Sequence, residues 1–300
     1  ILAAAHNLEA PTIRNYPSAR ALERALAARY KIDLDQVLAT AGADDALDRT
    51  CRAMLEHGRE SIVIDPTFEM ITRYAQMTKA TITRIPWKDR APFPIEAILS
   101  QITEATRHIA LVSPNNPTGE VIDGDALERI ATSAPHALVV LDHAYVEFAA
   151  EHDLTELALT FPNVVVVRTM SKAWGMAGLR VGYVLGQPRV IDWLRAVGNP
   201  YAVTGPSAKI AIARLTAPSA GWATSVRVSA ACCSARARSS KTGCGKMRSL
   251  GRAAELAIAS SSAWAMASRA SGKMHVSSRP MPTYWLAWPG NRNATRPGRL

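Results

Sequence analysis

The chain has 300 residues, of which 48% are hydrophobic, enough for one large or two modest domains with a real core. Its formal net charge of +10 is uneven, since residues 1–200 hold 20 Lys and Arg against 24 Asp and Glu, whereas 201–300 hold 15 basic residues and a single acid, Glu255. No apolar run reaches the roughly 18 residues of a membrane helix and the first residues lack the features of a signal peptide, so we expect a cytoplasmic globular enzyme without a membrane span.

The amino-terminal part begins with a helix signal. The turn Asn15-Tyr16-Pro17 precedes residues 18–30, whose apolar side chains recur at helical spacing. The short apolar run 37–41 then leads to a glycine turn at Gly42 and a second helix that continues to Leu55. A helix that opens on small residues leaves backbone N–H groups free for a phosphate, although an ordinary Asp N-cap explains the same residues and is favoured by this stretch alone.

From residue 61 onward, apolar runs and amphipathic segments alternate, which indicates strands and helices in turn. The pattern predicts strands at 61–65, 81–86, 108–113, 137–141, 164–167 and 181–185, and helices at 70–77, 95–102 and 126–131. Repeated strand, loop and helix units form a mostly parallel sheet that is covered on both faces. We therefore predict a three-layer α/β/α fold, with ligands bound at the carboxyl ends of the strands.

A lone lysine follows the most apolar of these strands. The four valines 164–167 are typical of a strand buried on both faces, and Ser171-Lys172 come just after it. A lysine that is partly desolvated at a strand end is a candidate amine nucleophile, because burial lowers its pKa and frees its lone pair. A solvated surface lysine is the alternative for this stretch alone.

Other polar or aromatic residues also follow predicted strands. Asp142 ends a buried strand, where an unpaired carboxylate is costly, so it needs a protonated ring nitrogen or an arginine as partner. Asn116 lies in a loop that its prolines hold stiffly, and Phe68 offers a flat ring. Arg180, eight residues after Lys172, is a fork of donors suited to a phosphate. Turn formation is the alternative for Asn116. Tyr145, three residues after Asp142, could place a phenol beside the same ligand, with packing as its alternative.

An ordered set of motifs carries a family resemblance. Asn115-Asn116-Pro117-Thr118-Gly119, Asp142-x-Ala144-Tyr145 and Ser171-Lys172 with Gly178-Leu179-Arg180 follow one another at the spacing of the fold-type I pyridoxal-phosphate enzymes. Within that class, residues 15–216 most resemble the histidinol-phosphate aminotransferases. The resemblance implies the cofactor pyridoxal 5′-phosphate and a homodimer that acts on small amino and keto acids. No metal site is assigned, because Cys51, Cys232, Cys233 and Cys244 lack zinc-ligand spacing.

The resemblance also implies a role for each matching residue. Lys172 binds the cofactor covalently and moves the proton at the substrate Cα, while Asp142 keeps the ring nitrogen protonated. Asn116 and Tyr145 hold the ring oxygen, and Phe68 stacks on the ring. The remaining expected contacts are to the phosphate: the backbone of Ala43 and Asp44, the side chains of Thr169, Ser171 and Arg180, and Tyr16 of the partner subunit. His143 departs from the pattern, because the family usually has glutamate there. Its imidazole either alters the local electrostatics or, as a neutral surface residue, has no effect.

The ends of the chain depart furthest from the family. We predict a remnant of an amino-terminal arm in 1–15, a cofactor-binding large domain in 16–200 and the start of a small domain in 201–217. Residues 218–300 are basic and rich in Ser, Ala, Arg and Trp. Three explanations compete for them: a diverged small domain, a basic nucleic-acid-binding tail, or an out-of-frame translation, which we favour. We name no arginine for the substrate carboxylate.

The predicted activity is therefore amino transfer between an amino acid such as glutamate and a phosphorylated keto acceptor. Two alternatives keep the cofactor: a lyase like the threonine-phosphate decarboxylases, and a cofactor-binding remnant without turnover. Nucleic-acid binding by the tail is the least favoured reading.

Overall fold

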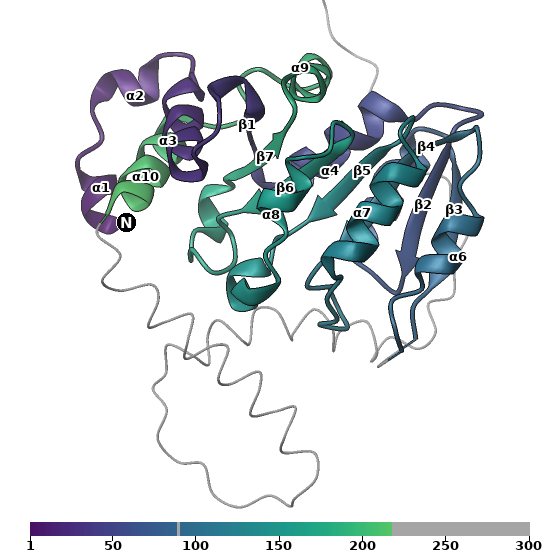
Figure 1. Cartoon of the computed structure of the whole chain (residues 1–300). Helices are drawn as coiled ribbons and strands as arrows, with labels where there is room; N and C mark the ends of the chain where they lie inside the picture. The colour runs from purple at the N-terminus through teal and green to yellow at the C-terminus, as the bar shows by residue number, and fades with distance from the viewer. Residues whose placement is uncertain (89–90, 218–300) are drawn as a thin grey trace, which may run out of the picture. The chain divides into compact units, whose positions relative to one another are not determined.

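A seven-stranded sheet forms the centre of the computed structural model, which describes residues 1–88 and 91–217 (Figure 1). The strand order is β1-β7-β6-β5-β4-β2-β3. β7 pairs antiparallel with both β1 and β6, and the other four pairings are parallel. The strands are β1 Val37–Thr40, β2 Glu60–Asp65, β3 Thr81–Pro86, β4 Thr106–Val112, β5 Leu138–Asp142, β6 Val164–Thr169 and β7 Gly182–Gly186.

Helices cover both faces of this sheet. One hydrophobic cluster joins the sheet to α3, α6, α7, α8 and α10, and a second joins the opposite face to α4, α5 and α9. The predicted three-layer α/β/α fold is thereby confirmed. The α-helices are α1 Leu2–His6, α2 Ala10–Arg14, α3 Arg20–Tyr30, α4 Gly42–Met54, α5 Glu69–Met77, α6 Ile95–Ser100, α7 Gly124–Ser133, α8 Thr155–Ala158, α9 Pro188–Ala196 and α10 Gly205–Thr216. Short 3₁₀ turns are η1 Leu34–Gln36, η2 Val146–Phe148, η3 Ala150–His152 and η4 Ala177–Leu179.

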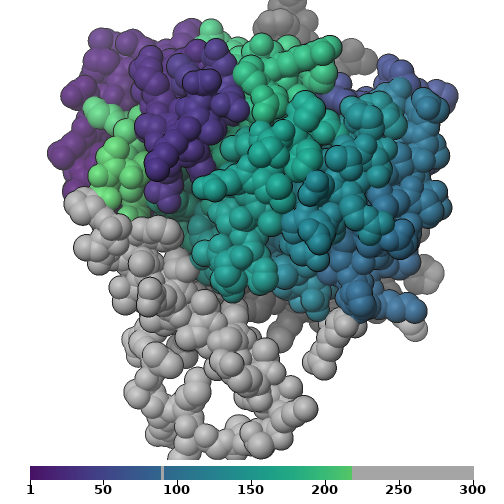
Figure 2. Space-filling model, in the orientation of Figure 1, coloured from purple at the N-terminus to yellow at the C-terminus, as the bar shows by residue number. Residues whose placement is uncertain are grey.

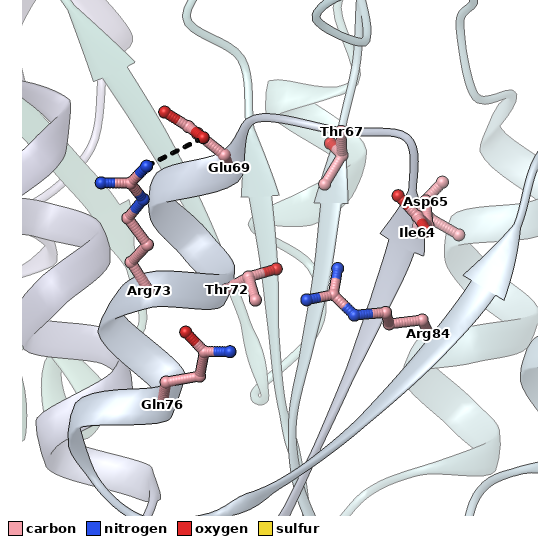
Figure 3. Close-up of a pocket in the computed structure, with 8 residues that line it drawn as sticks. All are labelled: Ile64, Asp65, Thr67, Glu69, Thr72, Arg73, Gln76 and Arg84. Carbon is pink, nitrogen blue, oxygen red and sulfur yellow. Dashed lines mark hydrogen bonds and ion pairs between the residues drawn. The ribbon is translucent and has the colours of Figure 1, made fainter. Parts of the chain in front are cut away.

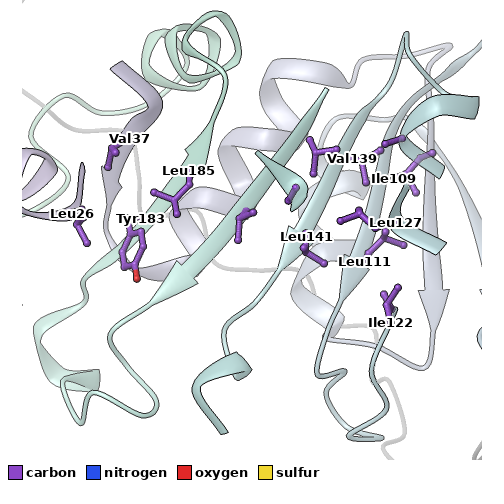
Figure 4. Close-up of a cluster of buried hydrophobic side chains, with 14 of the residues drawn as sticks. Leu26, Val37, Ile109, Leu111, Ile122, Leu127, Val139, Leu141, Tyr183 and Leu185 are labelled. Atoms are coloured by element: carbon purple, nitrogen blue, oxygen red, sulfur yellow. The ribbon is translucent and has the colours of Figure 1, made fainter. Parts of the chain in front are cut away.

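The valine run of β6 shows why the central strands are apolar without interruption. Val164 and Val166 belong to the cluster beneath α7 and α8, part of which Figure 4 shows, whereas Val165 and Val167 belong to the cluster beneath α4 and α9. All four side chains are fully buried. Because successive side chains of a strand point to opposite faces, a strand between two helical layers needs apolar residues at every position.

The direction of β7 decides where Arg180 lies. The carboxyl ends of β1, β2, β4, β5 and β6 share one edge of the sheet, and β7 begins at that edge because it runs the opposite way. Gly182 is paired with both Thr40 and Thr169. The sequence places Arg180 before a strand rather than after one, and the antiparallel pairing brings it to the same edge as Asp142 and Lys172.

Several boundaries differ from the predicted ones. The first long helix begins at Arg20 rather than at residue 18, and Asp142 is the last residue of β5 rather than the first after it. The structure also contains five helices that the sequence pattern did not predict: α1, α2, α8, α9 and α10. Signals for α10 are present in the sequence, since Pro206 occupies its first turn and Thr204 Oγ1 accepts a hydrogen bond from the Ser207 N–H as a helix cap.

The amino-terminal helices pack beside the last described helix. α10 contacts α1, α2 and α3, and Figure 2 shows the purple amino-terminal segment next to the green α10. The division into an arm, a large domain and the start of a small domain stays a prediction. The predicted tail, 218–300, lies outside the described residues. Among the helices that are described, none has the length and apolar character that crossing a membrane requires.

A buried histidine links β4 to α4 and β2. His108 is fully buried; its Nε2 lies 3.3 Å from Thr50 Oγ1 and its Nδ1 lies 2.9 Å from Ser61 Oγ. Thr50 donates its own hydroxyl proton to the Leu47 carbonyl, so Nε2–H is the donor to Thr50 and Ser61 donates to Nδ1. The ring is therefore neutral, and burial lowers the pKa of His108 from 6.5 to about 4.

We expect His108 to make the fold sensitive to acid. The unfolded chain takes up the proton near pH 6.5 and the folded chain only near pH 4, so this contribution to stability is lost as the pH falls between these values. The loss amounts to about 3 kcal/mol in the free energy of unfolding. Urea unfolding at pH 7 and pH 4.5 should show a smaller acid loss for His108→Gln than for the parent. His57→Gln, a change at an exposed histidine, should follow the parent; equal acid losses in all three proteins would contradict the assignment.

Candidate active site

The predicted site residues gather at the edge of the sheet where the parallel strands end. Phe68 follows β2, Asn116 follows β4, Asp142 ends β5, and Lys172 follows β6. Ala43 and Asp44 lie in the first turn of α4, Thr169 ends β6, and Ser171 and Arg180 lie between β6 and β7. Open α/β sheets bind ligands at this edge.

The start of α4 has the free backbone donors that an anion needs. Its N-cap residue is Ala41, and no side chain caps it. Asp45 Oδ2 instead accepts a hydrogen bond from the Ala41 N–H at 2.9 Å, outside the helix. The alternative of an ordinary Asp N-cap is therefore not observed. The N–H groups of Ala43 and Asp44 lie at the positive end of a 13-residue helix.

Two glycines allow the backbone to close around this helix start. Gly42 has φ +81°, and a Cβ there would lie 2.6 Å from Arg180 Nη2. A Cβ on Gly182 would lie 2.4 Å from the carbonyl carbon of Gly42 and 2.7 Å from the Ala43 nitrogen. Neither position has room for a larger residue, because the obstacles are backbone and a guanidinium that is itself held in place.

Arg180 joins the helix start to the lysine loop. Its Nη2 donates to Asp44 Oδ2 at 2.8 Å and its Nη1 donates to Ser171 Oγ at 3.3 Å. Thr169 Oγ1 accepts a hydrogen bond from the Ser171 N–H at 3.1 Å, which fixes the turn after β6. Guanidinium, hydroxyl and uncapped helix N–H groups together form a cradle for a phosphate. The Asp44 carboxylate, which the sequence does not assign a role, holds Arg180 over that cradle.

Lys172 is exposed, which corrects the predicted partial desolvation of this lysine. Its Nζ lies 5.1 Å from the centre of the Tyr145 ring, in a cation–π contact. Lys172 lies in the loop Ser171–Gly175, which follows β6, and the described residues do not enclose its amine. What positions Lys172 is therefore the turn that carries it and the neighbouring ring of Tyr145.

Asp142 is the buried carboxylate of the site. It is 3% exposed, and its Oδ1 accepts a hydrogen bond from the Ala144 N–H at 3.0 Å. Burial raises the pKa of Asp142 to about 6, while the hydrogen bond from Ala144 and the positive charge of Lys172 oppose the rise. Its Oδ2 accepts no hydrogen bond from the described residues. A cationic N–H donor would satisfy this oxygen and stabilise the charged carboxylate.

His143 is buried, so the alternative that places it at the surface is wrong. The Leu154 N–H donates to its Nε2 at 3.2 Å, and its Nδ1–H donates to the Ser113 carbonyl. Burial and the positive charge of Arg168 lower the pKa of His143 to about 4, so the ring is neutral. Its role is to tie the segment after β5 to the end of β4.

The two asparagines in the loop after β4 differ in their hydrogen bonds. Asn115 Nδ2 donates to the Pro66 carbonyl at 2.9 Å and to Thr118 Oγ1 at 3.0 Å, and its Oδ1 accepts from Thr67 Oγ1 at 2.7 Å. The Asn116 side chain makes no hydrogen bond within the described ranges. Asn115 therefore holds the loop against the start of α5, and Asn116 keeps its amide for a ligand.

Phe68 and Tyr16 occupy different environments. Phe68 is the N-cap residue of α5 and packs in part against the hydrophobic cluster beneath α4 and α5. Tyr16 is 84% exposed, and its ring packs on Tyr201 with the centroids 4.8 Å apart. A role for Tyr16 within its own subunit is not supported by this contact. Its predicted reach to a partner subunit stays a prediction.

A buried ion-pair cluster behind Lys172 goes beyond the residues that the sequence singled out. Arg168 Nη2 donates to Glu147 Oε1 at 3.1 Å, and the same oxygen accepts a hydrogen bond from Trp174 Nε1 at 3.1 Å. Both charged side chains are 6% exposed. Trp174 follows Lys172 by two residues, so the cluster fixes the loop from beneath. The sequence does hold a signal for this cluster: Arg168 is a charged residue at the end of a valine strand, and a buried charge needs a partner.

Comparisons with known proteins show which chains this one is similar to. The sequence model described as "Aminotransferase class I and II" matches residues 1–236. A histidinol-phosphate aminotransferase of Methanococcus maripaludis is 39% identical over 180 residues, which cover 58% of this chain and 47% of the relative. The chain spans about half the length of the curated relatives that it matches at this level.

Two solved structures share the fold. The histidinol-phosphate aminotransferase of Sinorhizobium meliloti, in complex with pyridoxal-5′-phosphate, has a TM-score of 0.67 at 24% identity, over 76% of this chain and 62% of that one. The L-threonine-O-3-phosphate decarboxylase of Porphyromonas gingivalis has a TM-score of 0.58 at 25% identity, over 71% of this chain and 69% of that one.

Proposed function

Because the chain belongs to the family of class I and II aminotransferases, we propose that it transfers amino groups with pyridoxal 5′-phosphate, as an enzyme of the histidinol-phosphate aminotransferase type. The observation that carries this proposal is the buried Asp142, whose free Oδ2 lies at the same sheet edge as Lys172 and the uncapped start of α4. A carboxylate, an amine and a phosphate cradle are the three groups that this cofactor requires.

The residues of this edge suit the separate parts of the cofactor. The start of α4, with Ser171, Thr169 and Arg180, would hold the phosphate, and Asp142 Oδ2 would accept the N–H of the pyridine ring. Asn116 and Tyr145 would face the ring oxygen, and Phe68 would cover the ring. Supporting this assignment, the Asn116 amide and Asp142 Oδ2 have no hydrogen-bond partner within the described ranges, and α4 has no capping side chain.

The chain's own residues would direct the proton transfers. The cofactor would supply a site for the electron pair that remains on the substrate Cα after its proton leaves. Lys172 is the base that would remove this proton and return it, since its amine is exposed. Asp142 would hold the proton at the ring nitrogen, because a carboxylate that is already desolvated gains most from a cationic partner.

The substrates and the assembly are also part of the proposal. A glutamate-like amino donor and a phosphorylated keto acceptor fit the resemblance of the chain to histidinol-phosphate aminotransferases. A homodimer would let the exposed Tyr16 reach the phosphate of the neighbouring subunit.

The experiment is a half-reaction of the full chain, loaded with pyridoxal 5′-phosphate and mixed with histidinol phosphate alone. We expect at most one equivalent of the carbonyl product per chain, because no acceptor is present to restore the cofactor. Addition of 2-oxoglutarate should then start turnover. Mass spectrometry of the product at several times would separate the single equivalent from turnover.

A second function, decarboxylation, is favoured by the structural similarity to a threonine-phosphate decarboxylase. Incubation of the loaded chain with L-threonine-O-3-phosphate distinguishes the two reactions, because a decarboxylase releases carbon dioxide catalytically without any keto acid. Carbon dioxide release without carbonyl product would overturn the aminotransferase proposal. Cofactor binding without either reaction would identify the chain as a binding remnant.

A further inference from the structure

The turn formed by residues 170–176 carries Lys172 and is closed by its own backbone. The Gly175 N–H donates to the Lys172 carbonyl at 3.0 Å. The Met176 N–H donates to the Met170 carbonyl, also at 3.0 Å. Gly175 has φ +69°, a left-handed conformation that favours glycine. Trp174 lies inside this turn, two residues after Lys172, so a contact that holds the Trp174 side chain also holds the backbone of Lys172.

The indole of Trp174 joins this turn to the segment that carries Tyr145. Its Nε1–H donates to Glu147 Oε1 at 3.1 Å, and both side chains are buried. Glu147 follows Tyr145 by two residues, just as Trp174 follows Lys172 by two. The Nζ of Lys172 lies 5.1 Å from the centre of the Tyr145 ring. One buried hydrogen bond therefore ties together the two backbone segments whose side chains meet in this contact.

Burial makes this hydrogen bond a stronger restraint than a contact at the surface. Figure 3 shows a surface contact for comparison, the ion pair of Arg73 with Glu69 on α5, in which both side chains are exposed. Water competes for such a pair, so it restrains the backbone little. The Glu147 carboxylate is shielded from water, and its Oε1 also accepts a hydrogen bond from Arg168 Nη2 at 3.1 Å. Hydrogen bonds to charged groups of this kind are among the strong ones.

Two arginines from other helices contact the same indole. The guanidinium carbon of Arg29, in α3, lies 5.0 Å from the centre of the Trp174 ring. That of Arg214, in α10, lies 6.0 Å from it. Cation–π contacts at these distances are attractive. Elements that are far apart in the sequence therefore anchor the indole, although the amine of Lys172 itself is exposed.

We propose that Trp174 is a positioning residue, which fixes where the Lys172 amine lies relative to the Tyr145 hydroxyl. It acts through its hydrogen bond to Glu147. The inference rests on the proposed function, in which Lys172 moves the proton at the substrate Cα and Tyr145 holds the ring oxygen of the cofactor. Both groups must meet one ring at the same time, and a displacement of about 1 Å in such a site lowers a rate by about 10²-fold.

The first test needs no cofactor and measures hydrogen exchange of the full chain by mass spectrometry of its peptides. Trp174→Phe keeps a buried ring and removes the N–H donor, so the amides of Gly175 and Met176 should exchange at least tenfold faster than in the parent. Trp193→Phe, at an exposed tryptophan of α9, should leave their exchange within about twofold. The exchange of the β5 amides in the same samples separates local loosening from a general loss of stability.

The second test uses the chain loaded with pyridoxal 5′-phosphate and supplied with histidinol phosphate and 2-oxoglutarate. Trp174→Phe should lower kcat about tenfold and leave both KM values within about twofold, because the change displaces the groups that move protons. A Tyr145→Phe background already lacks the hydroxyl that is to be positioned. In that background Trp174→Phe should therefore lower kcat by less than about threefold.

The two tests separate this inference from the proposed function. Equal exchange in the parent and in Trp174→Phe would overturn the inference, whether or not the chain turns over. Equal losses of kcat in the two backgrounds would also overturn it, because Trp174 would then act independently of Tyr145. Faster exchange in a chain that transfers no amino group would support the restraint by Trp174 and count against the proposed function alone.

Discussion

Replacement of Lys172 by alanine is expected to abolish amino transfer while leaving the fold intact. Loss of a general base alone lowers a rate by about 10²–10⁴-fold, and Lys172 would also provide the covalent attachment of the cofactor, so the total loss should exceed this range. The side chain is exposed, and it makes a cation–π contact with Tyr145. Surface substitutions of this kind usually change stability by less than about 0.5 kcal/mol.

Borohydride provides the direct measurement. The loaded parent chain, reduced and then denatured, should retain one cofactor per chain on the peptide that contains Lys172, as detected by mass spectrometry. Lys172→Ala should release all its cofactor on denaturation. Lys209→Ala is the control, because that lysine lies on α10 and pairs with Glu9 at 3.5 Å. If Lys172→Ala kept covalently reduced cofactor, another lysine would hold it and the site assignment would fail.

Replacement of Arg168 by methionine should destabilise the chain by about 3–5 kcal/mol, the cost of removing one partner from a buried ion pair. The change leaves the Glu147 carboxylate buried, with the Trp174 N–H as its remaining donor. The cost also includes the contacts of Arg168 Nη1 with Asp153 Oδ2 at 3.2 Å and Thr155 Oγ1 at 3.1 Å. The same change loosens the loop that carries Lys172, because Trp174 is anchored through Glu147.

Urea unfolding at pH 7 measures the loss. Arg129→Met is a matched control, since Arg129 forms an ion pair with Glu96 at 2.6 Å in which the side chains are 47% and 76% exposed. Exposed pairs contribute at most about 1 kcal/mol. In the double variant Arg168→Met with Glu147→Gln, which removes both charges and keeps an acceptor for Trp174, we expect part of the stability to return. Equal small losses in the Arg168 and Arg129 variants would show that the buried pair adds nothing.

Two buried acids near Lys172 differ in how their negative charge is balanced. Asp142, at the end of β5, and Glu147, in η2, are both buried acids, yet they differ in their partners. Glu147 is matched by Arg168, whereas burial raises the pKa of Asp142 to about 6. The matched acid stabilises the loop, and the unmatched acid remains for a cationic ligand.

The local pattern of the sequence determined the layers of the fold and most members of the site. Runs such as 164–167 showed both faces of β6 to be buried, because only a strand between two helical layers excludes polar residues at every position. The strand ends then marked Asp142 and Lys172 as candidates, and their order along the chain matched a known family. These conclusions depend on neighbours in sequence, so they needed no knowledge of distant contacts.

The tertiary structure decided what depends on residues far apart in the chain. It showed that β7 runs antiparallel and thereby brings Arg180 onto Asp44, 136 residues away. It also showed that Lys172 is exposed and that His143 is buried, two points that the local sequence left open. Strand direction and burial result from the pairing of distant segments, and periodicity along the chain does not encode which segments will pair.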